Sequence, residues 1–346
     1  MSSSRPRTPA ASRSGIRLPG CTVIASAVAL ALLPMQASHA GFFDFLRGKK
    51  GDAPRSTGPS RHTAPARHAA PARHLTPKDA ATSLRSAVAK LRPAKPQAAE
   101  EPTPSKLVAK KCEPAKFRLV VDVGHTRKSD GALSARNIPE YDFNLRLAAR
   151  LVEKLKSEGF EQTRLMITEG KARPSLLKRV ATANGSNADL FLSIHHDSVP
   201  DKFMEDWEFE GKKSKFSDRF AGWGLFVSHD NADFEASFAF ARMIGKRMKA
   251  NGYKFADQYS MPIMGKYRHD LLDRAAGVYR YDNLVVLMRT RMPAVLLEAG
   301  SIINRDEELE VASTERQDKT IGAVTDALKE YCGVPAPPLQ ATADRK

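Results

Sequence analysis

The chain has few residues of several types, and it lacks several patterns that mark known classes of protein. Its 346 residues include three cysteines and two tryptophans. So few cysteines exclude paired zinc-finger modules, and no aromatic RNA-binding pattern is present. No apolar run reaches the roughly 20 residues that a membrane-spanning helix needs. The mature chain is therefore expected to have no transmembrane segment.

The net charge of +16 is unevenly distributed along the chain. Residues 1–40 carry four arginines and no acidic residue, and residues 41–111 carry 15 basic against 5 acidic residues. Residues 112–346 carry 36 basic against 34 acidic residues, so the part able to fold is almost neutral. This distribution indicates no nucleic-acid partner. The basic arm suits association with acidic envelope polymers or lipid head groups.

Residues 1–40 have the pattern of a secretory signal peptide. Arginines precede an apolar stretch at 21–33, and Ala37 and Ala40 place small residues at the −3 and −1 positions of a cleavage site after Ala40. The alternative, a membrane anchor, is disfavoured because the stretch is too short to span a bilayer. The sequence therefore predicts export to the periplasm.

Three further segments follow the signal peptide. Residues 41–111 are rich in Pro, Ala, Arg and His and repeat the unit APARH, a composition typical of a disordered linker. The repeated histidines offer weak metal ligands, although a solvated basic linker is the simpler interpretation. Residues 112–333 are expected to form the catalytic domain, and residues 334–346 a disordered tail.

Apolar runs alternate with amphipathic stretches throughout the expected domain. Strands are predicted at 117–123, 164–168, 190–195, 225–228 and 295–298, and helices at 140–158, 175–187, 234–251 and 314–331. This alternation predicts an α/β fold with a mostly parallel twisted sheet covered by helices on both faces. Residues 198–223 and 254–283 are long for loops, and each is a candidate lid over a site.

Residues that can bind a metal stand at the ends of these elements. His125 follows the first strand, His195 ends a later one and Glu140 opens the first helix. Because ligand sites of open α/β sheets lie beyond the carboxyl ends of the strands, we expect these side chains to converge. Two histidines and a glutamate match a catalytic zinc site. Glu298 lies in an apolar run, where an unpaired carboxylate is costly, and is the candidate general base.

Four segments carry a resemblance to a known family. They read VVDVGHT, PEYDFN, DLFLSIHHDS and MPAVLLEAGSIINRDEE. Over about residues 117–331 the chain resembles the zinc-dependent N-acetylmuramoyl-L-alanine amidases of the periplasmic AmiC type (amidase type 3). These enzymes cleave peptidoglycan between the lactyl group of N-acetylmuramic acid and L-alanine of the stem peptide. The resemblance implies Zn²⁺ held by His125, Glu140 and His195, with Glu298 as the catalytic residue, and a periplasmic activator protein as a further partner.

The chain departs from the family pattern in the loops around the site. Val123 stands where the family usually has proline, and Arg127 makes the next loop more cationic and is a candidate substrate contact. The usual Ser-Ile-His-Ala-Asn ends here in His195, His196 and Asp197. Successive strand side chains point to opposite faces, so His195 is expected to reach the metal. His196 is expected to support the ligands from behind or to face the substrate.

Cys112 and Cys332 remain after signal cleavage and bracket the expected domain. Domain termini are often close in space, and paired cysteines usually bridge in an oxidising compartment. We therefore expect a disulfide between Cys112 and Cys332 and no metal role for either residue.

Two alternative functions stay open at this stage. One is an inactive envelope-binding protein that has kept the fold, although the complete set of two histidines and two glutamates argues against it. The other is a zinc peptidase that acts within the stem peptide, which analysis of the digestion products would distinguish from an amidase.

Overall fold

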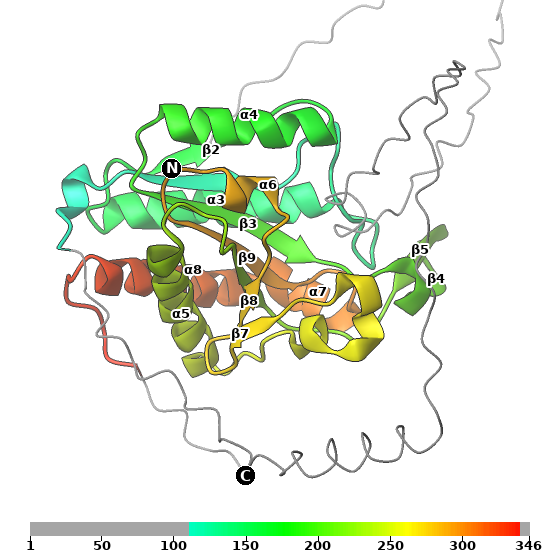
Figure 1. Ribbon diagram of the computed structural model, residues 1–346. Coiled ribbons are helices and arrows are strands. Elements are labelled where there is room, and N and C mark those ends of the chain that lie inside the picture. Colours follow the sequence, from blue (N-terminus) through cyan, green and yellow to red (C-terminus); the bar gives the residue numbers. More distant parts are fainter. Residues whose placement is uncertain (1–110, 340–346) are drawn as a thin grey trace, which may run out of the picture. The chain divides into compact units, whose positions relative to one another are not determined.

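The computed structural model describes residues 111–339 (Figure 1). The expected signal peptide and all but the last residue of the expected linker lie outside the described residues. The described part is built on a seven-stranded sheet with the order β2-β1-β3-β9-β6-β8-β7. Within residues 111–339 no helix is both long and apolar enough to cross a bilayer.

The first four strands of this order are all parallel. Their bounds are Arg164–Met166 for β2, Leu119–Val123 for β1, Leu190–Asp197 for β3 and Ala294–Ser301 for β9. Every residue of β1, β3 and β9 is buried, as expected for strands covered on both faces. The predicted α/β fold with a mostly parallel sheet is confirmed.

The remaining three strands make the sheet mixed. They are β6 (Gly224–Val227), β8 (Val278–Arg280) and the edge strand β7 (Leu271–Asp273). Strand β6 runs antiparallel to β9, whereas β8 is parallel to β6 and antiparallel to β7. The reversal at β6 pairs Gly224 with Glu298, so the start of β6 lies beside the candidate general base.

Helices cover both faces of the sheet. One face packs against α3 (Glu140–Ser157), α5 (Phe234–Ala250) and α8 (Thr314–Tyr331), and the other against α4 (Ala172–Gly185) and the short α6 (Val285–Met288). Alternate residues of β1 point to opposite faces of the sheet: Val121 packs in the core with α3 and α8, whereas Val120 packs in the core with α4. Helix α7 (Arg305–Ala312) follows the carboxyl end of β9.

The boundaries of two elements differ from the sequence-based expectation. Strand β1 begins at Leu119, because Phe117 follows a 3-10 turn at Pro114–Lys116 and turns its ring onto Phe160 and Tyr331, with 6.3 Å between centroids in both pairs. Helix α4 begins at Ala172 and holds Pro174 in its first turn, where a missing N–H costs no intrahelical hydrogen bond.

The two long stretches have different roles in the fold. Residues 198–223 contain a separate hairpin, β4 (Glu205–Phe209) and β5 (Lys212–Phe216), after a 3-10 turn at Asp201–Phe203. Residues 254–283 contain 3-10 turns at Asp257–Ser260 and Pro262–Tyr267 and then β7 and β8. The second stretch therefore supplies strands to the main sheet, and only the first can be removed without removing strands of the main sheet.

The ends of the described domain are joined. Cys112 and Cys332 form a disulfide with 4.6 Å between their Cα atoms, so the expected bridge is present. The backbone N–H of Cys112 also donates to the Cys332 carbonyl at 3.3 Å. Beyond the bridge, the carbonyl of Pro337 accepts from Arg247 of α5 at 3.1 Å, which places the start of the expected tail against the domain.

Candidate metal centre and catalytic site

His125 lies on the loop that leaves β1. The N–H of Gly124 still donates to the Ile194 carbonyl of β3 at 3.0 Å, and the backbone of His125 then turns into the left-handed region with φ of 64°. This conformation costs a non-glycine residue roughly 1–2 kcal/mol. Surrounding contacts must therefore hold the loop in the shape that directs the imidazole toward α3.

Glu140 is the first residue of α3 and reaches back toward the sheet. Its carboxylate accepts hydrogen bonds from the N–H groups of Ala132 at 3.2 Å and His196 at 3.3 Å. The side-chain amide of Asn144, one turn further along α3, donates to the same carboxylate at 3.1 Å. These donors favour an ionised carboxylate and fix its orientation.

The three expected ligand residues converge on one point. Nε2 of His125 lies 2.9 Å from Oε2 of Glu140, and Nδ1 of His195 lies 2.9 Å from Oε1 of the same carboxylate. The two imidazole rings meet edge to face with 4.9 Å between centroids. All three residues are buried, and each offers a ligand atom within 4.8 Å of the others. The arrangement is a compact set of two nitrogen ligands and one oxygen ligand.

The protonation of the cluster suits a metal ion. Burial is the main cause that lowers the pKa of His195 to about 4, against the opposing effect of Glu140. Burial would raise the pKa of Glu140, but His125 and His195 outweigh it and hold that pKa well below its usual value. Near neutral pH His195 is thus an uncharged imidazole and Glu140 a carboxylate, which are the forms that bind metals.

His196 supports the cluster through Asn144. The Asn144 amide donates to Glu140 and, at 3.3 Å, to the Gly124 carbonyl, so its oxygen faces His196, whose Nδ1 lies 2.8 Å away. Because that oxygen only accepts, Nδ1 of His196 carries the proton. Burial is the main cause that lowers the pKa of His196 to about 3. The ring of His196 therefore contacts Asn144, while its backbone N–H donates directly to Glu140.

Glu298 lies beside His195 on the neighbouring strand. The two residues are register partners between β3 and β9, so their side chains leave the same face of the sheet. Glu298 is 1% exposed, and neither carboxylate oxygen has a hydrogen-bond partner within residues 111–339. Burial, together with the charges of Asp197 and Glu140, raises its pKa well above the usual value. A raised pKa makes this carboxylate, once ionised, a stronger base toward water at the adjacent cluster.

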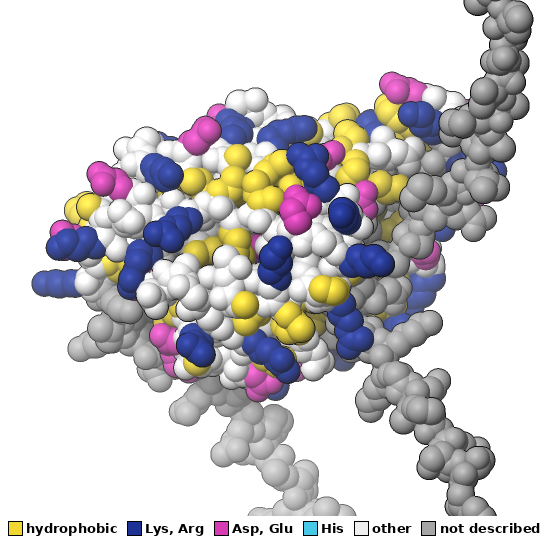
Figure 2. All heavy atoms as spheres, turned by 90° about the horizontal axis from the view of Figure 1, so that it is seen from above, with side chains coloured by type: hydrophobic (Ala, Val, Ile, Leu, Met, Phe, Trp, Pro, Cys, Tyr) yellow, Lys and Arg dark blue, Asp and Glu magenta, His cyan; other side chains and the backbone are white. Residues whose placement is uncertain are grey.

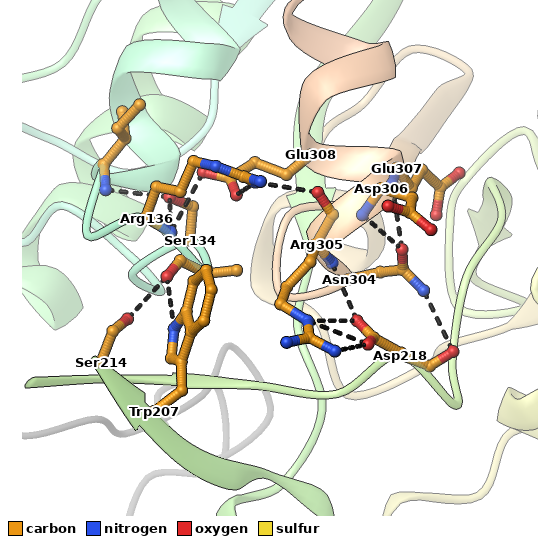
Figure 3. A network of polar contacts seen from close by, with 12 residues as sticks. Ser134, Arg136, Trp207, Ser214, Asp218, Asn304, Arg305, Asp306, Glu307 and Glu308 are labelled. Carbon is orange, nitrogen blue, oxygen red and sulfur yellow. Dashed lines mark hydrogen bonds and ion pairs between the residues drawn. The ribbon is translucent and has the colours of Figure 1, made fainter. Parts of the chain in front are cut away.

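The loop that leads to Glu140 is tied to the β4–β5 hairpin (Figure 3). The indole Nε1 of Trp207 and the hydroxyl of Ser214 both donate to the Ala135 carbonyl at 2.8 Å. Arg136 in the same loop pairs with Glu308 of α7 at 2.6 Å. The hairpin and α7 therefore brace the loop. Whether residues 198–223 act as a lid stays a prediction.

Arg127 lies at the surface outside the cluster. Its guanidinium is stacked over the ring of Tyr141, with 5.5 Å from Cζ to the centroid. Two buried residues near the cluster, Asn144 and Arg179, were not predicted from the sequence. The position of Asn144, four residues after Glu140 on the same helix face, was a usable signal.

Gly124 is packed so closely that a side chain there would disturb the cluster. A Cβ atom would lie 2.4 Å from Nε2 of His195 and 2.6 Å from the Ile194 carbonyl oxygen. We expect Gly124→Ala to displace His195 and to weaken metal binding by about 10- to 100-fold, the range seen when the surroundings of metal ligands are altered. Metal affinity measured by chelator competition tests this expectation.

Gly322 of α8 provides the matched control for this change. A Cβ atom at Gly322 would meet nothing within 4 Å. Gly322→Ala should leave metal affinity unchanged and stabilise the helix by about 0.5–1 kcal/mol. Equal metal affinity in both variants would contradict the close packing inferred around His195.

Comparison with known proteins places this geometry in a family. The sequence model of N-acetylmuramoyl-L-alanine amidases matches residues 119–330. The uncharacterized protein YqiI of Bacillus subtilis is 25% identical over 231 residues, which cover 64% of this chain and 89% of that protein. The amidase AmiC of Escherichia coli is 24% identical over 228 residues, 62% of this chain and 52% of AmiC.

Among solved structures, the catalytic domain of the amidase CwlV from Bacillus (Paenibacillus) polymyxa is 26% identical. It matches with a TM-score of 0.46 over 63% of this chain and 99% of that domain. The family match covers the sheet, its helices and all four candidate site residues. The chain belongs to the N-acetylmuramoyl-L-alanine amidase family, whose members are peptidoglycan amidases.

Proposed function

We propose that this amidase hydrolyses the bond between the lactyl group of N-acetylmuramic acid and L-alanine of the stem peptide, using Zn²⁺. The observation that carries the proposal is the convergence of His125, Glu140 and His195 beside the unpartnered carboxylate of Glu298. A family match over residues 119–330 supplies the substrate class.

The residues at the cluster fit zinc. Two imidazoles and one carboxylate are a common protein ligand set of catalytic zinc, which leaves a fourth position open. The set is buried, and its ionisation favours metal binding. When bound there, zinc lowers the pKa of a coordinated water to about 7 and acts as a Lewis acid toward the carbonyl of the substrate.

Glu298 is assigned the proton transfers. A nearby cation favours the ionised form of this carboxylate and so opposes the effect of its burial. Glu298 takes a proton from the water as the water oxygen attacks the lactyl carbonyl carbon. The carbon–nitrogen bond then breaks, and Glu298 returns the proton to the alanine nitrogen. The products are the lactyl carboxylate and a stem peptide with a free amino terminus.

Other residues position the ligands and the substrate in this proposal. Asn144, backed by His196, holds the Glu140 carboxylate. Arg127 is exposed on the loop that begins with His125, and its charge suits the carboxylates of the stem peptide. Control by a periplasmic activator protein belongs to the same proposal.

The proposal places the enzyme in the periplasm. Residues 1–40 have the pattern of a cleavable signal, and Cys112 and Cys332 form a disulfide of the kind that persists in oxidising compartments. Mass analysis of the protein recovered from the periplasm should find a mature amino terminus at Gly41. An uncleaved terminus would argue against this location.

A digest of purified peptidoglycan with and without a chelator tests the reaction. We expect whole stem peptides with free amino-terminal L-alanine and glycan strands with intact lactyl groups, and no release when the metal is removed. Fragments cut within the stem peptide would identify a peptidase instead. A protein that binds zinc but releases nothing would support the inactive binding protein.

A further inference from the structure

One arginine of helix α4 is buried beneath the loop that carries His125. Lys and Arg side chains are spread over the α4 side of the molecule (Figure 2). Arg173 and Lys178 of α4 are exposed to solvent, as is usual for charged side chains. Arg179 differs because it is 2% exposed. Its guanidinium donates to the Val123 carbonyl at 2.5 Å and also to the carbonyl of His125. A buried arginine thus contacts the backbone of an expected metal ligand directly.

The charge of Arg179 is balanced by Asp122 of β1. The two side chains form a buried ion pair, and the other carboxylate oxygen of Asp122 accepts from the Ser193 hydroxyl of β3 at 2.8 Å. The planar guanidinium fork presents several donors in fixed directions, so it can serve the carboxylate and two carbonyls together. A lysine ammonium at the same place can keep the ion pair, but it cannot reproduce the fork.

The backbone at His125 needs such a contact. Its φ of 64° lies in the left-handed region, which an L-residue adopts only when its surroundings enforce it. The neighbouring contacts lie to either side: the N–H of Gly124 donates to β3, and the hydroxyl of Thr126 donates to the Gly170 carbonyl at 2.6 Å. Arg179 contacts the carbonyl of His125 itself.

We propose that Arg179 is a positioning residue that fixes the backbone of His125, so that the imidazole meets Glu140 before a metal arrives. The inference rests on the proposed function, because it takes His125 as a ligand. Its consequence is specific: loss of the fork lowers metal affinity even where the fold and the buried ion pair survive.

The test compares Arg179→Lys with the wild-type full-length protein. Zinc dissociation constants are measured by competition with a chromogenic chelator, and thermal melting of the metal-free protein reports the fold. We expect zinc to bind about 10- to 100-fold more weakly to the variant, in the range found for residues that orient metal ligands. Arg247→Lys is the matched control, since Arg247 is another buried arginine, on α5, that donates to Glu330 and Pro337.

Each outcome bears on the inference. A dissociation constant for Arg179→Lys within about threefold of wild type, well below the roughly tenfold minimum expected, would overturn it. Wild-type protein that binds no zinc would overturn the zinc assignment itself. An unaffected Arg179→Lys variant beside zinc-binding wild type would overturn only the role of Arg179, so the two failures are distinguishable. If Arg179→Lys does not fold, the zinc dissociation constant of the uncharged double variant Asp122→Asn/Arg179→Gln is compared with wild type by the same criteria. Failure of both variants to fold would overturn the inference, because the arginine would then be a requirement of the fold.

Discussion

Replacing Glu298 with glutamine is expected to slow peptidoglycan hydrolysis by about 10²- to 10⁴-fold, the usual contribution of a general acid–base residue. Glutamine has nearly the same shape but cannot take up the proton of the attacking water. Glu298 is not among the three converging ligand residues, so the variant should retain its zinc. Removing a buried carboxylate without a hydrogen-bond partner should also leave the free energy of unfolding unchanged or increase it.

Glu308→Gln is the matched control, since Glu308 of α7 is equally buried but forms an ion pair with Arg136 in the loop before α3. That variant should lose stability, but its amide oxygen can still accept from Arg136 and keep the loop in place, so most of the activity should remain. The informative measurements are turnover of peptidoglycan and zinc per chain, made on the same preparation. Turnover of the Glu298→Gln variant above about a tenth of wild type, with zinc retained, is incompatible with a general base at Glu298. Loss of zinc would instead indicate that Glu298 binds the metal.

The convergence at the metal centre could be predicted because it depends on strand ends. His125 and His195 each close an apolar run, and the carboxyl ends of parallel strands meet at one edge of the sheet. Glu140 joined them as a carboxylate at the start of the first predicted helix, and the family resemblance implied the same three ligands. The pairing of His195 with Glu298 could not be predicted, because the register between β3 and β9 depends on pairing across the sheet.

The role of Arg179 could not be predicted from the sequence for a different reason. Arg179 shares the buried face of α4 with Ser175 and Ala183, whereas Lys178 is exposed, but the helix pattern alone does not identify the partner of a buried cation. The difference arises because α4 lies against β1, where Asp122 supplies an opposite charge. The antiparallel direction of β6 was similarly unpredictable, since a four-residue strand carries no signal for its orientation.

Some missed elements did have a signal in the sequence. The β4–β5 hairpin turns at Glu210 and Gly211, both with positive φ, between alternating residues such as Trp207 and Phe209. A two-residue turn ending in glycine between alternating strands is a recognised hairpin pattern. Asn304 immediately precedes helix α7, and its side chain accepts from the N–H groups of Asp306 and Glu307, a recognisable N-cap. The hairpin falls within residues 198–223, which the sequence pattern presents as a long loop, whereas α7 lies between the last predicted strand and the last predicted helix.

The double replacement Cys112→Ser/Cys332→Ser is expected to lower the free energy of unfolding by about 2–5 kcal/mol, the usual range for a native disulfide. The bridge spans 220 residues, for which loop-closure entropy alone gives about 5 kcal/mol. Within the folded state, Cys332 is buried at the end of α8, and Phe117 holds the entering chain against Phe160 and Tyr331. These contacts remain without the bridge, so the variant should fold.

Activity should change little in this variant, because the bridge and the candidate site lie at opposite ends of β1. Cys112 precedes the amino end of that strand, whereas His125 follows its carboxyl end. The measurement is urea denaturation of the metal-free protein beside peptidoglycan turnover, with a thiol count on unreduced wild-type protein from the periplasm. Two titratable thiols in that protein, or a variant as stable as wild type, would contradict the structural role of the bridge. Reduced turnover at full zinc occupancy would show that the amino end of the sheet influences the site at its carboxyl end.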